Sequence, residues 1–326
     1  MKRRVLALLL CIVVAGSLLV GCGSKPAEQQ SPAPAENSAQ SKPEEQPAAE
    51  KYKVYLITMD QMDQHWVNVD KGCKKAVDEL GNIDYQWLAP DVKDDAKQIE
   101  CINNAVAGGA DAILLAANGP VAVTSALEEA QKAGVKIVYV DSPADFPGIA
   151  TFATDNKAAG KTAGEEMLKA LQAAGITEGK IGIVNVNAAT ASVVAREEGF
   201  RSAFEGSKFQ ILETQYSEGD AAKSKDIAAN YITQGCVGIF GANEGCTVGT
   251  GNAIKEAGKN VIGVGFDKSD AILNLIKEGF LVCTMAQNPD VMGYEGMKAA
   301  AQALSGQYTG PKNVDTGVTV LDKSKL

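Results

Sequence analysis

Residues 59–66, MDQMDQHW, directly follow the apolar run VYLIT, which is expected to form a buried strand. This segment holds the only histidine of the 326-residue chain, His65, and the first of its two tryptophans, Trp66, beside Asp63 and Gln64. Carboxylates accept hydrogen bonds, amides donate and accept them, and flat rings stack on apolar faces. These side chains fit a small polyhydroxylated ligand, with Trp66 or His65 against its face and Asp63 or Gln64 at its edge.

Polar side chains recur at nearly every point where an apolar run ends. Ligands of open parallel sheets bind beyond the carboxyl ends of the strands, so these positions predict a binding site. Turn and helix-cap preferences of Asn and Asp explain about half of the set, but not the rings beside the carboxylates. The set comprises Asp60, Asp63, Gln64, Asn118, Asp141, Ser142, Asn187, Glu218, Asp220, Asn243, Glu244, Phe266, Asp267 and Gln287.

Short apolar runs alternate with longer stretches of helical period from residue 53 onward. This alternation predicts right-handed crossovers and parallel sheets that are covered by helices on both faces. The strands are too many for one small doubly wound unit, so we expect an α/β fold with two doubly wound lobes. The expected strands are 53–58, 83–88, 112–116, 136–140, 180–186, 210–216, 237–241, 261–265 and 281–286.

We expect the chain to cross between the two lobes three times. TFATDNKAAGKTAGEEM runs from a strand end straight into a long helix, which places one crossing near 154–155. A second crossing is expected near 287–288, before the helix that follows Pro289, and a third near residue 315. The N-terminal lobe would then contain residues 52–154 and 288–314, and the C-terminal lobe residues 155–287 and 315–326.

The N-terminal segment has the pattern of an export signal. Three basic residues precede an apolar run that is too short to span a bilayer and ends in LVGC, at Cys22. A cysteine at this point is typical of a bacterial lipobox, so we expect residues 1–22 to be a lipoprotein signal and Cys22 to carry lipid. An ordinary secretory signal is the alternative. Residues 23–51 lack the apolar residues needed for a core and predict a disordered tether.

The charge and the cysteine content of the chain restrict the binding partners and the disulfides that it could have. A net charge of −9 and a pI near 4.9 disfavour nucleic acid. Five cysteines remain in the body, and an odd number leaves at least one free thiol. Cys73 and Cys101 fall on the first two expected helices, where a disulfide between them is possible, but nothing in the sequence decides it. The five are Cys73, Cys101, Cys236, Cys246 and Cys283.

Six motifs follow one another in a specific order: KIVYVDS, ATDNKAAGKTAGE, VAREEGF, FGANEG, VIGVGFD and TMAQNPDVMGYEG. From about residue 53 to 326, this ordered set closely resembles the ribose- and galactose-type solute-binding proteins of bacterial ABC importers. The resemblance implies the type I periplasmic-binding fold, in which two α/β lobes are joined by a three-strand hinge and a sugar-like ligand binds between them.

The resemblance also implies roles for individual residues. The arginine of the family's R-x-x-G-F falls on Arg196, the asparagine of its N-D pair on Asn243, and the glutamine before its hinge proline on Gln287. Its paired aromatic residues fall on His65 and Trp66, so the first ring here is an imidazole. Together with the polar residues at strand ends, the predicted ligand-binding set is Asp63, His65, Trp66, Asp141, Ser142, Arg196, Asn243, Phe266, Asp267 and Gln287.

Two departures from the ribose binders concern the identity of the sugar. Ser142 stands where they carry an arginine, and they carry an aromatic residue near the position of Gly219. The Asp141–Ser142 pair and the segment YSEGDAAKS resemble the corresponding segments of receptors for the signal autoinducer-2. Those receptors also carry a lysine after the first strand and a Pro-x-Ala motif after the strand that here reads VGIFG, and this sequence has neither. A sugar-like ligand other than ribose is favoured, with autoinducer-2 as an alternative.

Several of these residues could instead have a purely structural role. Asp267 could be only a turn residue, Arg196 a surface residue paired with a neighbouring glutamate, and His65 a packing or capping residue. Trp66 could belong to the core, as Trp87 is expected to do.

Enzymatic chemistry is disfavoured by the motifs. The sequence has no G-x-S-x-G, P-loop, C-x-x-C or H-E-x-x-H pattern, and a catalytic triad would have to use His65. We therefore expect no cofactor, no metal and no catalytic residue, with a carbohydrate-active enzyme as the remote alternative. The expected protein is a monomeric, lipid-anchored receptor on the outer face of the cytoplasmic membrane that delivers a monosaccharide or polyol to an importer permease. A sensor that signals through another partner is the second alternative.

Overall fold

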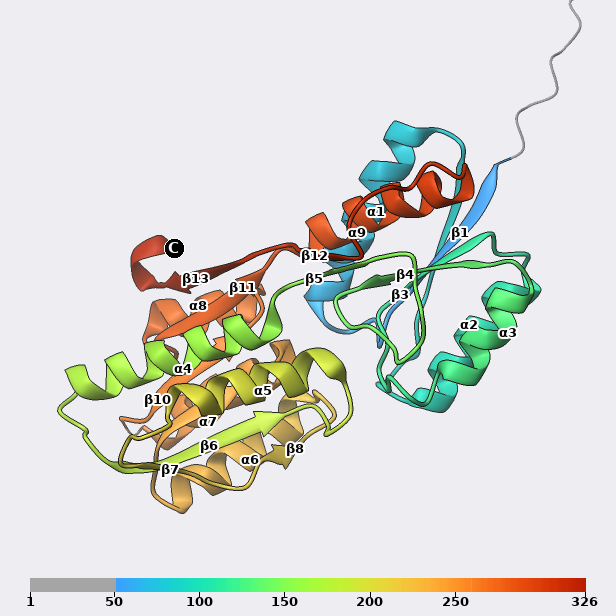
Figure 1. The fold of residues 1–326 in the computed structure, drawn as a ribbon. Helices are drawn as coiled ribbons and strands as arrows, with labels where there is room; N and C mark the ends of the chain where they lie inside the picture. Colours follow the sequence, from blue (N-terminus) through green and yellow to red (C-terminus); the bar gives the residue numbers. More distant parts are fainter. Residues whose placement is uncertain (1–50, 259) are drawn as a thin grey trace, which may run out of the picture. The chain divides into compact units, whose positions relative to one another are not determined.

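The computed structural model describes residues 51–258 and 260–326. The predicted signal peptide, its lipidation site Cys22 and, apart from Lys51, the predicted tether lie outside the described residues. Across the described ranges, no helix has both the length and the apolar character that a membrane span requires. The described elements build two β-sheets, and each sheet with its helices forms one half of the molecule (Figure 1).

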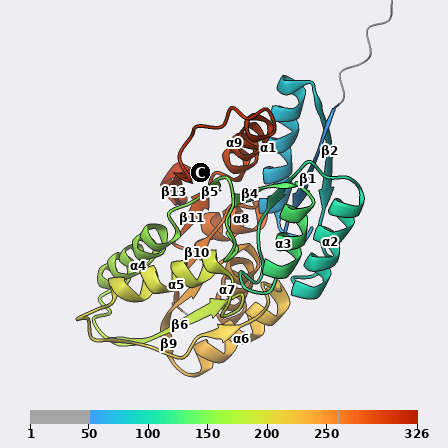
Figure 2. The same ribbon diagram turned by 45° about the vertical axis from the view of Figure 1, so that its right-hand side comes forward.

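The first half contains six strands in the order β12-β5-β4-β3-β1-β2, and all neighbouring pairs are parallel. All four residues of β3, AILL, are buried, because helices cover both faces of the sheet. Helices α1 and α9 pack together on one face, and α2 and α3 on the other (Figures 1 and 2). The elements are β1 (Tyr52–Ile57), α1 (Gln64–Leu80), β2 (Ile83–Leu88), α2 (Asp95–Ala107), β3 (Ala112–Leu115), α3 (Thr124–Lys132), β4 (Lys136–Val140), β5 (Thr151–Ala153), α9 (Pro289–Leu304) and β12 (Asn313–Asp315).

The second half has the strand order β13-β11-β10-β9-β6-β7, with β8 paired to β6. Only β13 runs antiparallel to its neighbour. Helices α4 and α5 cover one face, and α6 and α7 cover the other, with α8 beside α7. The elements are α4 (Asn156–Ala173), β6 (Gly179–Asn185), α5 (Ala191–Ala203), β7 (Phe209–Ile211), β8 (Gln215–Tyr216), α6 (Ala221–Thr233), β9 (Cys236–Gly241), α7 (Glu244–Ala257), β10 (Ile262–Phe266), α8 (Asp270–Glu278), β11 (Cys283–Gln287) and β13 (Val318–Asp322); a 3₁₀ turn, Lys323–Lys325, follows β13.

The chain passes between the halves at three neighbouring segments: from β5 to α4, from β11 to α9, and from β12 to β13. Hydrogen bonds tie these segments together. The Asn288 Nδ2 donates to the Thr316 carbonyl oxygen at 2.8 Å, and the Asp155 amide donates to the Asp315 Oδ1 at 3.0 Å. The predicted fold class is therefore confirmed: an α/β protein with two doubly wound, mainly parallel sheets joined by three strand connections.

Several strands differ from the sequence prediction. The run 210–216 is split into β7 and β8. Residues 212–214 stand opposite only two residues of β6, and at this interruption the Glu213 carbonyl oxygen accepts a hydrogen bond from the Tyr231 hydroxyl at 2.6 Å. The strand end predicted at Thr151 is β5, whereas β12 and the antiparallel β13 were not predicted as strands. With three residues, β12 is too short to give a periodic pattern, and β13 lies in a tail that was only expected to end on the second lobe.

The possible disulfide between Cys73 and Cys101 is contradicted. Cys73 is buried on α1 against one face of the first sheet, whereas Cys101 is half-buried on α2 against the other face. The sheet lies between the two helices, so their thiols do not meet. All five cysteines of the described chain are free.

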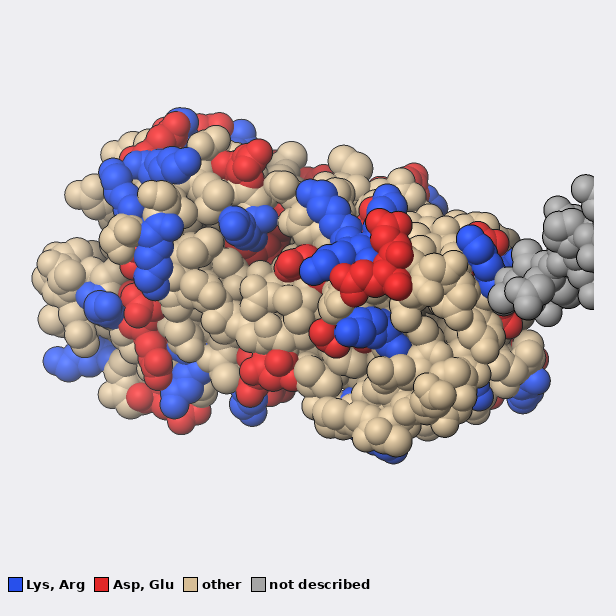
Figure 3. Space-filling model, turned by 90° about the horizontal axis from the view of Figure 1, so that it is seen from above, with Lys and Arg blue, Asp and Glu red and all other residues tan. Residues whose placement is uncertain are grey.

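Surface charges are mixed rather than separated by sign. On the face shown in Figure 3, Lys and Arg lie among Asp and Glu. Exposed pairs such as Lys255–Glu278, at 2.6 Å, and Lys225–Glu256, at 3.0 Å, illustrate this arrangement. Such exposed pairs contribute little to stability, about 0–1 kcal/mol each.

Candidate functional site

A small cavity lies where the carboxyl ends of both parallel sheets face each other. Its volume is about 20 Å³, enough for roughly one water molecule. Residues from both halves line it: Met59, Asp63, His65, Trp66, Lys93, Asp141, Val186, Thr190, Ser192, Val193, Arg196, Asn243, Asp267 and Gln287. We call this the inner cavity.

The predicted ligand-binding residues gather at the inner cavity with two exceptions. Ser142 and Phe266 are fully buried and lie behind its wall. The Ser142 Oγ accepts a hydrogen bond from the Ser192 amide at 3.4 Å, and the Phe266 ring supports Arg196. The two side chains therefore hold cavity residues in place and do not face the cavity themselves. A role in ligand binding stays a prediction for the whole set.

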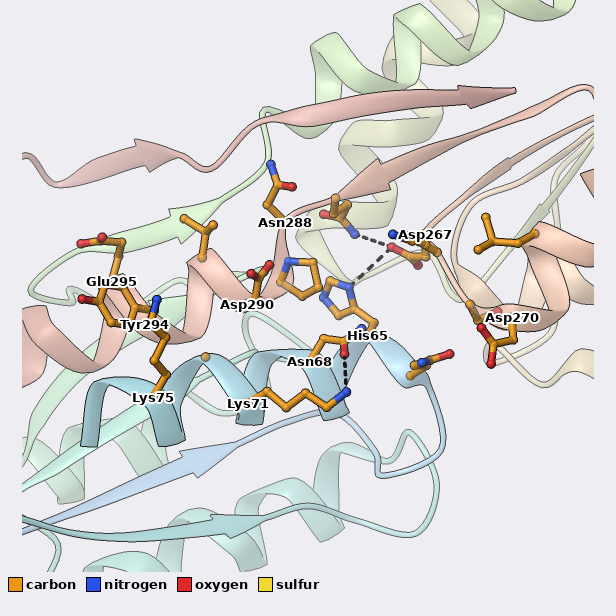
Figure 4. Close-up of a pocket in the computed structure, with 18 residues that line it drawn as sticks. His65, Asn68, Lys71, Lys75, Asp267, Asp270, Asn288, Asp290, Tyr294 and Glu295 are labelled. Carbon is orange, nitrogen blue, oxygen red and sulfur yellow. Dashed lines mark hydrogen bonds and ion pairs between the residues drawn. The ribbon is translucent and has the colours of Figure 1, made fainter. Parts of the chain in front are cut away.

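His65 joins an aspartate from each half. Its Nε2 lies 3.0 Å from the Asp141 Oδ2. Its Nδ1 lies 3.6 Å from the Asp267 Oδ1, a contact that Figure 4 marks with a dashed line. Burial alone would lower the pKa of His65, but Asp141 and Asp267 outweigh both burial and the nearby Arg196, and they raise it above its ordinary value of 6.5. The charge of a protonated His65 faces a carboxylate from each half, although its Nε2 is not aligned as a hydrogen-bond donor and the 3.6 Å contact of its Nδ1 is too long for a hydrogen bond.

Asp141 and Asp267 share an unusual backbone conformation. Asp141 follows β4 with φ of 61°, and Asp267 follows β10 with φ of 74°. Aspartate is among the few non-glycine residues that tolerate this left-handed region. In each case the backbone N–H still reaches the neighbouring strand, to Phe152 and Met285, while the carboxylate lines the cavity. Single residues held in this region are concentrated at functional sites.

Arg196 is a buried cation held from three sides. It projects from α5 and is 3% exposed. Its Nε donates to the Asn156 Oδ1 at 2.8 Å, its Nη1 donates to the Ala242 carbonyl oxygen at 3.0 Å, and its guanidinium lies 4.0 Å from the Phe266 ring centroid. Its Nη2 is 3.7 Å from the Asp141 Oδ2. Burial would raise the pKa of Asp141, but His65 and Arg196 hold it below its usual range.

Lys93 is a cavity residue that the sequence did not reveal. It lies in the loop between β2 and α2, and its ammonium pairs with Asp60 and, at 3.0 Å, with the Asp63 Oδ2. Its surroundings, LAPDVKDD, have the composition of a surface loop. The sheet places the ends of β1 and β2 side by side, and only this pairing brings Lys93 to the two aspartates that follow β1.

Asn243 serves both as a helix cap and as a cavity residue. Its Oδ1 accepts a hydrogen bond from the Cys246 amide at 3.0 Å and so caps α7, while its Nδ2 donates to the Asp63 Oδ2 at 3.4 Å. Asp220, by contrast, caps α6 and does not line the inner cavity. Asn243 and Asp220 are therefore both helix caps, as their position after a strand suggested. Of these two, Asn243 alone also lines the inner cavity.

Direct hydrogen bonds join the halves around the cavity. The Thr190 hydroxyl donates to the Asn118 carbonyl oxygen at 2.6 Å, and the His65 amide donates to the Glu244 Oε2 at 3.1 Å. Burial, with the nearby charges of Asp63 and Asp267, raises the pKa of Glu244 to about 7. These bonds hold the halves closed over the cavity.

Two larger openings adjoin the inner cavity. A side groove of about 630 Å³ lies between the first turns of α1, α8 and α9, and shares His65, Asp267 and Gln287 with the cavity (Figure 4). On another side, a mouth of about 720 Å³ shares Asp63 and Lys93 with it. The described residues contain no cluster of His, Cys, Asp or Glu that could hold a metal ion.

A family model described as a periplasmic binding protein domain matches residues 54–308. The chain belongs to this family. The resemblance inferred from the ordered motifs is thus confirmed. Proteins of this family work outside the cytoplasm, so membership implies an extracytoplasmic location for this chain.

Known relatives and structures are similar over most of their length. The ribose import binding protein RbsB of Haemophilus influenzae is 30% identical over 74% of this chain and 82% of its own. A solute-binding protein from Agrobacterium vitis, solved with bound D-fucose, is 32% identical with a TM-score of 0.79, covering 83% of this chain and 96% of its own. One from Agrobacterium radiobacter, in complex with D-arabinose, is 29% identical with a TM-score of 0.81, covering 85% and 96%. The relatives are named as binding proteins and not as enzymes.

Proposed function

We propose that this protein captures a monosaccharide or polyol between its two halves and delivers it to the permease of a bacterial ABC importer. One observation carries the proposal: carboxylates, cations and amides from the strand ends of both sheets meet at one cavity between them. A charge-assisted hydrogen bond contributes about 1.5–3 kcal/mol net, so four or five such bonds support tight binding of a hydroxyl-rich molecule. Similar proteins named for ribose, fucose and arabinose support this ligand class.

Binding would proceed by opening and closing of two lobes, residues 52–154 with 288–314 and residues 155–287 with 315–326. The inner cavity, about 20 Å³, is too small for a sugar. Ligand entry would therefore separate the lobes and release His65 from its bridge between Asp141 and Asp267. Closure over the sugar would add contacts from the second lobe, and the ligand would shift the open–closed population by its differential affinity for the two states.

The site residues would divide the work by chemistry. Asp141 and Asp267 would accept hydrogen bonds from ligand hydroxyls, and Arg196 would donate to ligand oxygens. Trp66 would offer its ring to an apolar face of the sugar. Gln287 would complete the polar wall, because its Oε1 has no hydrogen-bond partner among the described residues while its Nε2 donates to the Asp267 Oδ1 at 2.6 Å.

A binding screen tests this function. Thermal shift and calorimetry with pentoses, hexoses, deoxysugars, polyols and autoinducer-2 should reveal one group of sugars or polyols that binds saturably. Asp141→Asn and Asp267→Asn should each weaken that binding about 10- to 150-fold. The matched control is Asp78→Ala, an exposed carboxylate on α1 outside the cavity, and it should bind like the parent. Unchanged binding in both cavity variants would refute the site, and binding of autoinducer-2 alone would assign a signalling receptor.

We propose further that the protein binds without turnover and works as a monomer attached to the membrane through lipid on Cys22. Incubation with candidate glycosides should leave them intact, and release of a free sugar would instead assign a carbohydrate-active enzyme. Cys22→Ser should move the protein from the membrane fraction to the soluble fraction of the producing cell, and an unchanged distribution would contradict the anchor. Sedimentation of the soluble variant should give the mass of one chain.

A further inference from the structure

Lys93 is an unusually buried lysine at the border of the inner cavity. Its side chain is 6% exposed, and it lines both the inner cavity and the mouth. Lysine is almost never this buried unless it is paired. The second half covers it: a Cβ added at Gly219 would lie 3.1 Å from the Lys93 Nζ. The ammonium therefore lies at the contact between the halves, beside the place where a ligand would bind.

The two carboxylates that hold Lys93 are not equivalent. Asp60 is 1% exposed and already accepts hydrogen bonds from the Met62 amide at 2.6 Å, the Asp63 amide at 3.1 Å and the Trp66 Nε1 at 3.3 Å. Asp63 lines the inner cavity, and among the described residues its carboxylate accepts from Lys93 and, at 3.4 Å, from the Asn243 Nδ2 only. Asp60 is thus part of the scaffold, whereas Asp63 keeps acceptor capacity for a ligand.

We propose that Lys93 is a positioning residue that holds Asp63 in place and ionised, so that Asp63 accepts a hydrogen bond from a ligand hydroxyl at the mouth end of the site. This inference rests on the proposed sugar-binding function. It adds that the ligand presents a hydrogen-bond donor at that end.

The charges around Asp63 make this role measurable. Burial raises the pKa of Asp63 to about 6, Lys93 opposes the rise, and Asp60 and Asp267 add to it. Glu244, which faces the same cluster, has a pKa of about 7. Without the Lys93 ammonium, the pKa of Asp63 must rise further, because burial and the acidic neighbours then act unopposed. Asp63 would become largely neutral near pH 7 and lose its strength as an acceptor.

Calorimetric titration of the best sugar from about pH 5.5 to 8.5 tests the inference. In the parent, affinity should rise with pH as Asp63 ionises. Lys93→Met should lower affinity at pH 7 at least about tenfold and move the rise to higher pH, with recovery near pH 8.5. Lys93→Arg keeps the positive charge and should keep the parent pH profile. The matched control is Lys132→Met on α3. Its exposed lysine pairs with Glu129 at 2.8 Å, and both residues lie outside the inner cavity and the mouth, so its profile should not change.

A second variant shifts the same profile in the opposite direction. Asp60→Asn removes a charge that raises the pKa of Asp63, so the rise in affinity should move to lower pH. Repeating the series in a Glu244→Gln background removes the titration of Glu244, and the difference between variants at each pH cancels that of His65, which all of them retain. A pH-independent loss in Lys93→Met, or an unmoved profile in Asp60→Asn, would overturn the role of Lys93. Parent protein that binds no sugar at all would instead refute the proposed function, so the two failures are distinguishable.

Discussion

The crossing of α4 and α5 predicts that one methyl group far from the ligand weakens binding. A Cβ added at Gly160 would lie 2.0 Å from the Arg196 carbonyl oxygen, whereas ordinary contacts of this kind begin at 3.4 Å. Close packing leaves no room to absorb the overlap. In Gly160→Ala, α5 must therefore move away from α4 by roughly 1 Å or more.

This displacement acts on the site through Arg196. The Nε–Asn156 and Nη1–Ala242 hydrogen bonds are 2.8 and 3.0 Å long, and a shift of roughly 1 Å would take them beyond hydrogen-bond length. Loss of one well-placed charged hydrogen bond to the ligand is worth about 1.5–3 kcal/mol, so affinity should fall about 10- to 150-fold. Overpacking should also cost about 1–3 kcal/mol of folding free energy.

Calorimetry with the best sugar, together with thermal denaturation, measures both effects. The comparison is Gly164→Ala, one turn along α4, where the added Cβ would meet the Ala203 Cβ at 2.6 Å and the Phe200 carbonyl oxygen at 2.9 Å, a milder overlap with α5 than the 2.0 Å at Gly160. It should also lose stability, but it should lose less affinity than Gly160→Ala, because the closest contacts lie one turn away from Arg196. If Gly160→Ala lost stability and still bound the sugar as tightly as the parent, the proposed link between the helix crossing and Arg196 would be wrong.

Two further predictions concern pH and thiol chemistry. The folded-state pKa of His65 is raised above 6.5 by Asp141 and Asp267, so this stabilisation is complete below the unfolded pKa and is lost as pH rises through the folded pKa. The free energy of unfolding should therefore decrease with rising pH more steeply in the parent than in His65→Gln, and parallel denaturant curves would contradict this linkage. Among the five described cysteines, Cys101 alone is not buried, so a thiol reagent should label it first in the native protein; peptide mapping identifies the residue, and Cys101→Ser should abolish the fast phase.

The sequence predicted the parts of the fold that depend on local pattern. The regular apolar runs became strands within one or two residues, as at β3 and β4, because helices on both faces of each sheet favour apolar side chains along the central strands. The edge strands β12 and β13 were missed as strands. Their positions are set by pairing with distant segments, such as β12 with β5, and not by local composition.

The candidate site likewise contains residues that local sequence motifs identify and residues that only the fold brings to it. Strand-end polarity and the ordered motifs pointed to Asp141, Arg196 and Asp267, whose side chains meet at the inner cavity. Lys93 and Thr190 were missed, because nothing in a surface-like loop indicates which distant residues will bury it. Phe266 was assigned to the ligand, but its ring lies under the Arg196 guanidinium. The position of Phe266 after a strand placed it correctly beside the inner cavity, but the sequence does not determine which way its ring points.

The two halves present their key aspartates by the same device. A parallel strand ends, the next residue adopts positive φ, its amide completes the ladder with the neighbouring strand, and its carboxylate faces the other half. Asp141 and Asp267 do this from β4 and β10. The conformation costs of order 1–3 kcal/mol for a residue that does not favour it, so alanine at either position would add backbone strain to the loss of charge. Asparagine tolerates the same conformation. Asparagine substitutions therefore measure the carboxylate alone, whereas a deficit that appears only with alanine would belong to the turn and not to the ligand.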